Sequence, residues 1–194
     1  MEAPWASRRA KLLNTDQALK AAVMDELRSV HALKTGALSM FDPMLHRVAA
    51  ERDSGATPDI VAELLARMHD AFSAHRTETA DHVRDLSERL QELGGTPAGT
   101  RTLGLTYGAK AWVALGGIGG QNHGANARNA FVFEHLEIAS LQILRELADR
   151  NEDEVTSMLA DRCVKQDQEM AATIGRNWTN VSVLMLATSS PTAL

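Results

Sequence analysis

The sequence contains very few cysteine and aromatic residues. Cys163 is the single cysteine among 194 residues, so the chain forms no internal disulfide, and this usage is typical of a reducing cytosol. Aromatic residues make up 4% of the chain, whereas alanine and leucine are common, and this balance favours helices over sheets. We therefore expect a helical protein in the cytoplasm.

The chain also lacks an excess of one charge and long hydrophobic runs. Its 20 basic and 25 acidic residues give a net charge of −5, and because both signs are mixed along the chain, nothing indicates binding to nucleic acid. No apolar run approaches the roughly 18 residues of a membrane span, and none follows the N-terminal charges as in a signal peptide. We expect neither a nucleic-acid partner nor a membrane span.

Four long segments carry hydrophobic residues at helical spacing. They cover residues 15–52, 58–93, 125–150 and 152–178, and no segment shows the sustained alternation of a β-strand. Pro43 lies within the first segment, where it should kink or interrupt the helix. The sequence predicts an all-α protein with an N-terminal tail over 1–14, a helical bundle over 15–180 and a C-terminal tail over 181–194.

The second and third predicted helices are joined by a long connection, residues 94–124. It holds a short helical candidate at 103–115 and the glycine cluster GGIGG at 116–120. No strand precedes these glycines, so a break or a close helix crossing explains them better than a phosphate-binding loop. A long crossover at this position is what a ferritin-like bundle requires, unlike a simple up-and-down bundle. We therefore predict a ferritin-like four-helix bundle.

Each predicted helix carries a polar residue in the middle of its hydrophobic face. Successive residues of a helix turn by about 100°, and on this basis hydrophobic positions flank Lys34, Thr79, Glu137 and Gln166. A single residue of this kind is common and has ordinary explanations. A lysine can extend its charged end to the surface, and a glutamine can hydrogen-bond to a backbone group. Four of them at similar depth predict a polar layer across the core, in which the carboxylate of Glu137 needs a partner.

Histidine and acidic residues lie beside this predicted layer. His75, Glu78 and His82 follow one another at spacings of three and four on the second helix, so their side chains converge. Glu134 lies at the edge of the hydrophobic face of the third helix, between solvent and the layer. Imidazoles and carboxylates are metal ligands, but a lone histidine on an apolar face is more often a hydrogen-bonded core residue. Both interpretations stay open.

Three motifs resemble those of a known family. FSAHRTETADHVRDL at 72–86, LQELGG at 90–95 and FEHLEIASLQIL at 133–144 are similar to the YciE/YciF-type ferritin-like stress proteins, and the resemblance extends over residues 25–174. It implies a ferritin-like four-helix bundle that is usually paired as a dimer. In metal-binding members it also implies two metal ions, held at the centre by carboxylates and histidines from all four helices.

The resemblance implies an incomplete metal site in this chain. It places Glu78 with His82, and either Glu134 or Glu137, at metal-ligand positions of the family in the second and third helices. Lys34 stands where the family has a glutamate, and the fourth helix has Gln166 and Asp167 where the family has several glutamates. Two divalent ions need several anionic oxygens, and a nearby ammonium opposes them. A working di-iron centre is therefore not expected.

Two hypotheses explain the predicted layer. In the first, Lys34 and Glu137 form an ion pair across the bundle, with Gln166, Thr79 and His82 donating around it, and this pair takes the place of metal. In the second, one divalent ion, iron or manganese, binds among the histidines and acids. Its candidate ligands are Glu78, His82, Glu137, Glu134, His75 and Asp167.

The two hypotheses correspond to two classes of function. The ion pair favours a metal-free, stress-related bundle that acts through assembly or interaction with another protein. The metal site favours a ferritin-like protein that handles iron or defends against peroxide. No serine or cysteine has a histidine and an acid at a spacing typical of nucleophilic enzymes, so we predict no catalytic residues. The wide hydrophobic faces and the resemblance predict a homodimer or a larger homo-oligomer.

Overall fold

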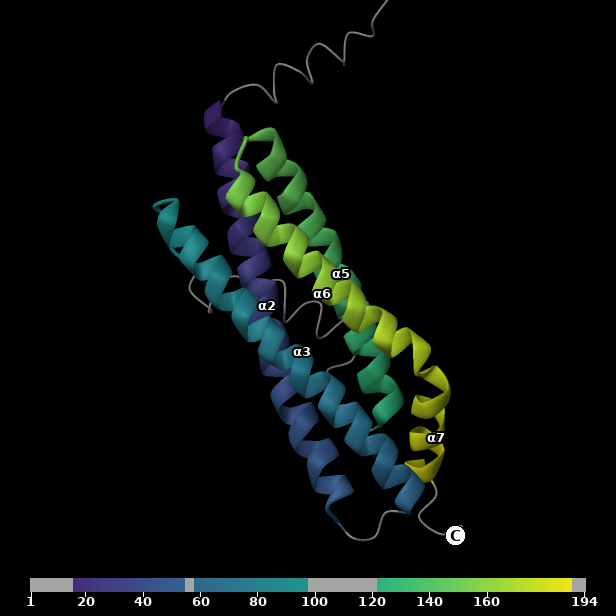
Figure 1. Cartoon of the computed structure of the whole chain (residues 1–194). Coiled ribbons are helices and arrows are strands. Elements are labelled where there is room, and N and C mark those ends of the chain that lie inside the picture. Colours follow the sequence, from purple (N-terminus) through teal and green to yellow (C-terminus); the bar gives the residue numbers. More distant parts are fainter. Residues whose placement is uncertain (1–15, 55–57, 98–121, 190–194) are drawn as a thin grey trace, which may run out of the picture.

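The computed structural model describes residues 16–54, 58–97 and 122–189. These residues form α2 (Asp16–Arg52), α3 (Asp59–Glu92), α5 (His123–Arg150), α6 (Glu154–Arg176) and α7 (Trp178–Ser189). The four long helices lie side by side, and α7 follows the end of α6 in a new direction (Figure 1). No strand occurs in the described ranges, which confirms the predicted all-α class.

The long helices form two pairs that pack on each other. α2 packs on α3 and α5 packs on α6, and the pairs meet where α2 contacts α5 and α3 contacts α6. Among the described helices, α2 and α6 are therefore diagonal across the bundle, and so are α3 and α5. Because a long connection joins α3 to α5, the arrangement has the crossover of a ferritin-like bundle.

The predicted bounds of the four long helices agree with the structure to within two residues at each end. Pro43 does not interrupt α2, contrary to one of the two expectations. Phe41 and Met44 beside it are buried, so tertiary packing holds the helix together through the proline.

The C-terminal end of the bundle differs from the expected tail. The boundary placed at residue 180 falls inside α7, whose Val181 and Leu184 are buried. The predicted N-terminal tail, the helical candidate at 103–115 and the GGIGG cluster lie outside the described residues.

Two of the three hydrophobic clusters in the described core flank the predicted polar layer, one on each side. On α2, Leu27 belongs to one cluster and Phe41 to the other, and Lys34 lies between them. On α5, Leu141 and Phe133 belong to the same two clusters, with the polar residues of that helix between them. Charged groups in this layer are consequently cut off from water at both ends and depend on one another.

Side-chain caps set where α5 and α6 begin. The side chain of Asn122 accepts a hydrogen bond from the backbone nitrogen of Ala125 at 2.8 Å. Asp153 does the same for the backbone nitrogen of Thr156 at 3.1 Å, and it also pairs with Arg89 of α3 at 2.7 Å. These caps satisfy backbone donors that a helix leaves open, and they fix the start of both helices.

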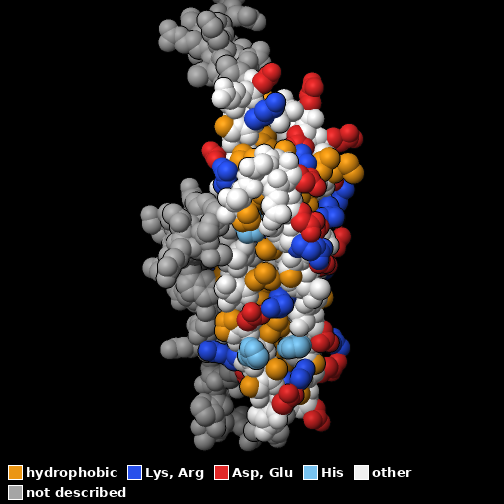
Figure 2. All heavy atoms as spheres, turned by 90° about the vertical axis from the view of Figure 1, so that its left-hand side faces the viewer, with side chains coloured by type: hydrophobic (Ala, Val, Ile, Leu, Met, Phe, Trp, Pro, Cys, Tyr) orange, Lys and Arg blue, Asp and Glu red, His pale blue; other side chains and the backbone are white. Residues whose placement is uncertain are grey.

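The surface mixes both charges. Seen from the left-hand side of Figure 1, hydrophobic side chains gather along the middle of the molecule, and acidic and basic ones lie next to one another at its right-hand edge (Figure 2). None of the described helices is both long and apolar enough to cross a bilayer.

Candidate functional site

Charged side chains from all four long helices meet at mid-length inside the bundle. We call them the charge cluster; its members are Lys34 on α2, His75 on α3, Glu134 and Glu137 on α5, and Asp167 on α6. None of them is more than 2% exposed. A set of ionisable groups this deeply buried is stable only if its members compensate one another.

Lys34 is the centre of the charge cluster. Its Nζ lies 2.6 and 2.7 Å from the two carboxylate oxygens of Asp167, and 3.1 Å from Oε2 of Glu137. The predicted contact between Lys34 and Glu137 is therefore present. The shorter contacts, however, go to Asp167 of the diagonal helix α6, which the sequence suggests only as a metal ligand.

His75 spans the other diagonal of the bundle. Its Nε2 lies 3.0 Å from Oε1 of Glu134 on α5, and its Nδ1 lies 3.1 Å from Oε2 of Glu78, one turn along α3. Glu134 is buried, whereas the side chain of Glu78 is 39% exposed. Glu134 thus belongs to the interior, and Glu78 lies at the rim.

The polar neighbours of the cluster are arranged differently from our expectation. Thr79 and Gln166 do not donate to the ion pair. The Thr79 hydroxyl donates to the backbone oxygen of His75 at 2.9 Å, and Gln166 Oε1 lies 2.7 Å from Nε2 of His82. The other ring nitrogen of His82 lies 3.9 Å from Asp167. Gln166 therefore orients His82 at the edge of the cluster.

The two cations of the cluster stay protonated because acids surround them. Burial lowers the pKa of Lys34, but the charges of Glu137 and Asp167 more than reverse this and hold it well above its usual value. Burial also lowers the pKa of His75, but the contact with Glu134 outweighs this and raises the pKa to about 9. Both side chains are charged at neutral pH.

His82 has the opposite character. Burial lowers its pKa to about 4, and the positive charge of Lys34 lowers it in the same direction. At neutral pH it is an uncharged imidazole held by Gln166, and it adds no charge to the cluster.

The acids of the cluster outnumber its cations. Burial raises the pKa of Glu137 and of Asp167 above the usual range, against the attraction of Lys34. Three carboxyl groups face two cations, so one proton held by the acids would balance the buried charge. A balanced cluster is the arrangement that a poorly solvated interior favours.

Three residues of the charge cluster could together hold a metal ion. His75, Glu134 and Asp167 each offer one ligand atom, and these atoms lie within 4.8 Å of one another. Oε2 of Glu134 and Oε1 of Glu137 are buried and have no hydrogen-bond partner among the described residues. Lys34, however, contacts both oxygens of Asp167, and α2 thus places a cation beside these donor atoms.

The structure separates the predicted metal ligands into two groups. It brings His75, Glu134 and Asp167 together. The remaining candidates have other neighbours: Glu78 contacts His75 from the rim, His82 faces Gln166, and Glu137 faces Lys34.

Sequence reasoning missed the central position of Asp167. Helical periodicity predicts Gln166 as the inward residue of the fourth helix, yet Gln166 is half-buried and Asp167 is fully buried. A signal was present, since the buried residues Cys163, Val164 and Met170 lie at spacings of three and four from Asp167. Counting these neighbours would have favoured Asp167.

A comparison with solved structures supports the fold. The bacterioferritin of Desulfovibrio desulfuricans, solved to describe its diiron site, matches with a TM-score of 0.64 over 93% of this chain and 94% of its own. The two sequences are 18% identical, so the match concerns the fold alone. It confirms the ferritin-like helical bundle.

A curated relative is similar over a shorter stretch. The DNA protection during starvation protein of Brevibacillus brevis is 30% identical over 94 residues. This stretch is 48% of the present chain and 60% of the relative, so the chain matches less than two thirds of that protein.

The family assignment rests on a longer match. The sequence profile of the family described as "Domain of unknown function (DUF892)" matches residues 56–183. This range covers most of the chain and includes α6 as well as α3 and α5, which carry the motifs at 72–86 and 133–144. The chain therefore belongs to the DUF892 family, the YciF-type ferritin-like family that these motifs resemble.

Proposed function

We propose that this protein is a stress-related ferritin-like bundle in which a lysine-centred charge cluster takes the place of a two-metal centre. Its role is then assembly or interaction with another protein in the cytoplasm, without di-iron chemistry. The observation that carries the proposal is the position of Lys34, whose ammonium contacts three carboxylate oxygens at 2.6–3.1 Å. The name of the Brevibacillus relative supports the link to stress.

Electrostatics support a cluster that excludes a pair of metal ions. A unit charge and a divalent ion about 4 Å apart repel each other by roughly 8 kcal/mol at an effective dielectric constant of about 20. An ion entering beside Lys34 must overcome this repulsion, displace the ammonium or remove its proton. Because the pKa of Lys34 is raised, loss of the proton is also costly.

A single ion is the second candidate, and one observation favours it. The ligand atoms of His75, Glu134 and Asp167 lie within 4.8 Å of one another. Oε2 of Glu134 has no hydrogen-bond partner among the described residues. In this alternative the protein binds one iron or manganese ion, as a protein of iron handling or peroxide defence would. It requires Asp167 to leave Lys34.

Assembly as a homodimer is part of the proposal. Val132, Leu136 and Ile143 lie along the outward face of α5 at spacings of four and seven, and they are 43%, 39% and 53% exposed. A hydrophobic stripe of this kind beside a filled core marks an interaction surface. We propose that a second copy of the chain covers it, because two-fold symmetric dimers, in which the same patch of both subunits meets, are the commonest homo-oligomers.

Metal analysis tests the proposal. The protein is purified without chelators, loaded with iron(II) or manganese(II), dialysed, and its metal content per chain is measured by mass spectrometry. We expect wild type to retain much less than one ion per chain and Lys34→Glu to retain more, since the variant replaces the cation by a carboxylate. Lys20→Glu, a change at an exposed residue of α2, is the matched control.

Two outcomes contradict the proposal in different ways. Two ions per wild-type chain would refute the lysine-centred cluster. One ion per chain that is lost in Glu134→Gln but kept in Glu78→Gln would favour the second candidate, because only Glu134 belongs to the three-residue group.

A further inference from the structure

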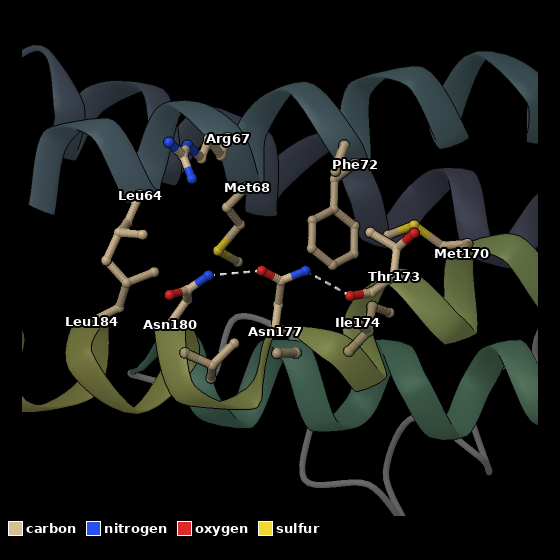
Figure 3. A pocket seen from close by; sticks show the side chains of 13 residues that line it. Leu64, Arg67, Met68, Phe72, Met170, Thr173, Ile174, Asn177, Asn180 and Leu184 are labelled. Carbon is tan, nitrogen blue, oxygen red and sulfur yellow. Dashed lines mark hydrogen bonds between the residues drawn. The ribbon is translucent and has the colours of Figure 1, made fainter.

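A pocket of about 230 Å³ lies between α3, α6 and α7 (Figure 3). It forms where α6 ends at Arg176 and the chain turns at Asn177, so that α7 takes a new direction (Figure 1). An apolar cavity of roughly 150 Å³ is sufficient to bind benzene. The pocket therefore has room for a molecule of about ten non-hydrogen atoms.

The walls of the pocket are hydrophobic and the pocket is elongated. Leu64 and Leu184 lie at one end, and Phe72 and Met170 lie toward the other (Figure 3). A helix rises about 1.5 Å per residue, so the stretch of α3 from residue 64 to residue 72 is about 12 Å long. Met68 also lines the wall, and methionine side chains adapt to irregular apolar ligands. An extended aliphatic chain suits this shape.

The amides at the edge of the pocket are occupied by the protein itself. Asn180 Nδ2 donates to Oδ1 of Asn177 at 2.7 Å, and Asn177 Nδ2 donates to the backbone oxygen of Thr173 at 2.8 Å (Figure 3). These bonds stabilise the turn between α6 and α7. Because these amide donors are already used, a ligand needs a different side chain as its main polar anchor.

That anchor is Arg67. It lines the pocket, pairs with Glu63 one turn earlier on α3, and its side chain is 70% exposed. A guanidinium has five N–H donors, so Arg67 keeps several for a further acceptor. Its planar geometry matches a carboxylate, which it binds through two parallel hydrogen bonds.

We propose that this pocket binds an unbranched aliphatic carboxylate of about eight to ten carbons, a length that follows from the pocket's size. The carboxylate pairs with Arg67, and the chain extends between α3 and α6 toward Phe72 and Met170. The site is independent of metal binding at the charge cluster. The ring of Phe72 lies 6.0 Å from that of Phe41, which in turn lies 5.6 Å from His75, so aromatic side chains separate the two.

Titration calorimetry with a series from hexanoate to dodecanoate tests the proposal. We expect saturable binding to one site, with an affinity that rises about fourfold for each added methylene and levels off when the pocket is full. The absence of saturable binding throughout the series would overturn the proposal. So would an affinity that keeps rising with chain length, because it indicates detergent-like adsorption.

Variants of residues that line the pocket test whether the ligand binds there. Ala71→Leu fills the cavity from its wall and should weaken decanoate and decanol alike, by at least about tenfold. Arg67→Gln should weaken decanoate about tenfold and leave decanol unchanged, because only the acid pairs with the guanidinium. Arg150→Gln is the matched control, since Arg150 pairs with Glu146 at the same i,i+4 spacing. Equal effects of the two arginine variants would overturn the proposal.

Methionine methyl signals give a second, structural readout. With ¹³C-methyl methionine, decanoate should shift the signals of Met68 and Met170, which line the pocket, and leave that of Met158 on the outer face of α6 unchanged. Shifts confined to other methionines would show that the ligand binds elsewhere. Helical circular dichroism confirms that each variant is folded.

Discussion

The two diagonals of the bundle are bridged by different cations. Lys34 on α2 reaches Asp167 on α6, and His75 on α3 reaches Glu134 on α5. Lys34 keeps its charge throughout the physiological range, since its pKa is raised. His75 has a pKa of about 9, so its charge is lost in moderately alkaline solution. One diagonal is therefore permanently paired, and the other depends on pH.

Each buried cation is compensated by a carboxylate of the diagonal helix. Both bridges are fully buried and both lie between hydrophobic clusters. Desolvation offsets most of the attraction in such pairs, so their main effect is to fix which helices face each other, while the loss of one partner is expensive. Removing Lys34 and His75 in turn measures what each bridge contributes to the free energy of unfolding.

The largest effect on stability is expected when the bridge between Lys34 and Asp167 is broken. Lys34→Met leaves the carboxylates of Asp167 and Glu137 without their cation, and the free energy of unfolding should fall by about 3–5 kcal/mol. Urea unfolding at pH 7, followed by circular dichroism, measures the loss. Lys20→Met, at an exposed position of the same helix, should leave the stability unchanged.

A combined variant sharpens this prediction. Adding Glu137→Gln and Asp167→Asn to Lys34→Met removes the uncompensated charges and should recover most of the lost stability. Neutralising Glu137 alone should recover less, because Asp167 makes the shorter contacts with Lys34. A Lys34→Met protein as stable as the Lys20→Met control would mean that the pairing contributes nothing.

The histidine diagonal should add a pH-dependent stability of up to about 3 kcal/mol, since its pKa rises from 6.5 to about 9 on folding. The folded state binds the proton more tightly than the unfolded state. The contribution is thus fully present below pH 6.5 and is lost as the pH rises through 9. Urea midpoints of wild type and His75→Gln measured from pH 6 to pH 9.5 should converge at the alkaline end.

Exposed His46 provides the control for this experiment. His46→Gln should follow the wild-type pH profile. A constant difference between wild type and His75→Gln across the range would mean that the contact with Glu134 does not depend on the charge of His75.

The smallest effect on stability, about 2 kcal/mol, is expected for His82. Its pH dependence is opposite to that of His75, because stability is lost in acid and not in alkali. Folding lowers the pKa of His82 from 6.5 to about 4, so stability is present above pH 6.5 and is lost as the pH falls through 4. We expect less than for His75 because its neighbour Gln166 is half-buried and water relieves part of the penalty. His82→Leu should flatten the wild-type loss between pH 6.5 and pH 4 in urea unfolding. Equal acid sensitivity of the two proteins would contradict this assignment.

Part of the candidate site was predictable from helical periodicity. Glu137 and Lys34 lie in the middle of the hydrophobic faces of their helices, so their burial and their need for partners follow from the sequence. Asp167 was harder to place, because the hydrophobic face of α6 is wide and a small rotation about the helix axis decides whether residue 166 or 167 points inward. Packing against α3 and α5 sets that rotation.

The four long helices and the depth of the charged layer follow from the sequence alone. The spacing of hydrophobic residues sets where each of these helices begins and which face it buries, and this is a local property. The pairing of the charged side chains, in contrast, depends on the tertiary structure. The order of the helices around the bundle places α6 diagonal to α2, and this order brings Asp167, ahead of Glu137, closest to Lys34. The burial of α7 also depends on the tertiary structure, because it comes from contacts with α3 and α5, which are far away along the chain.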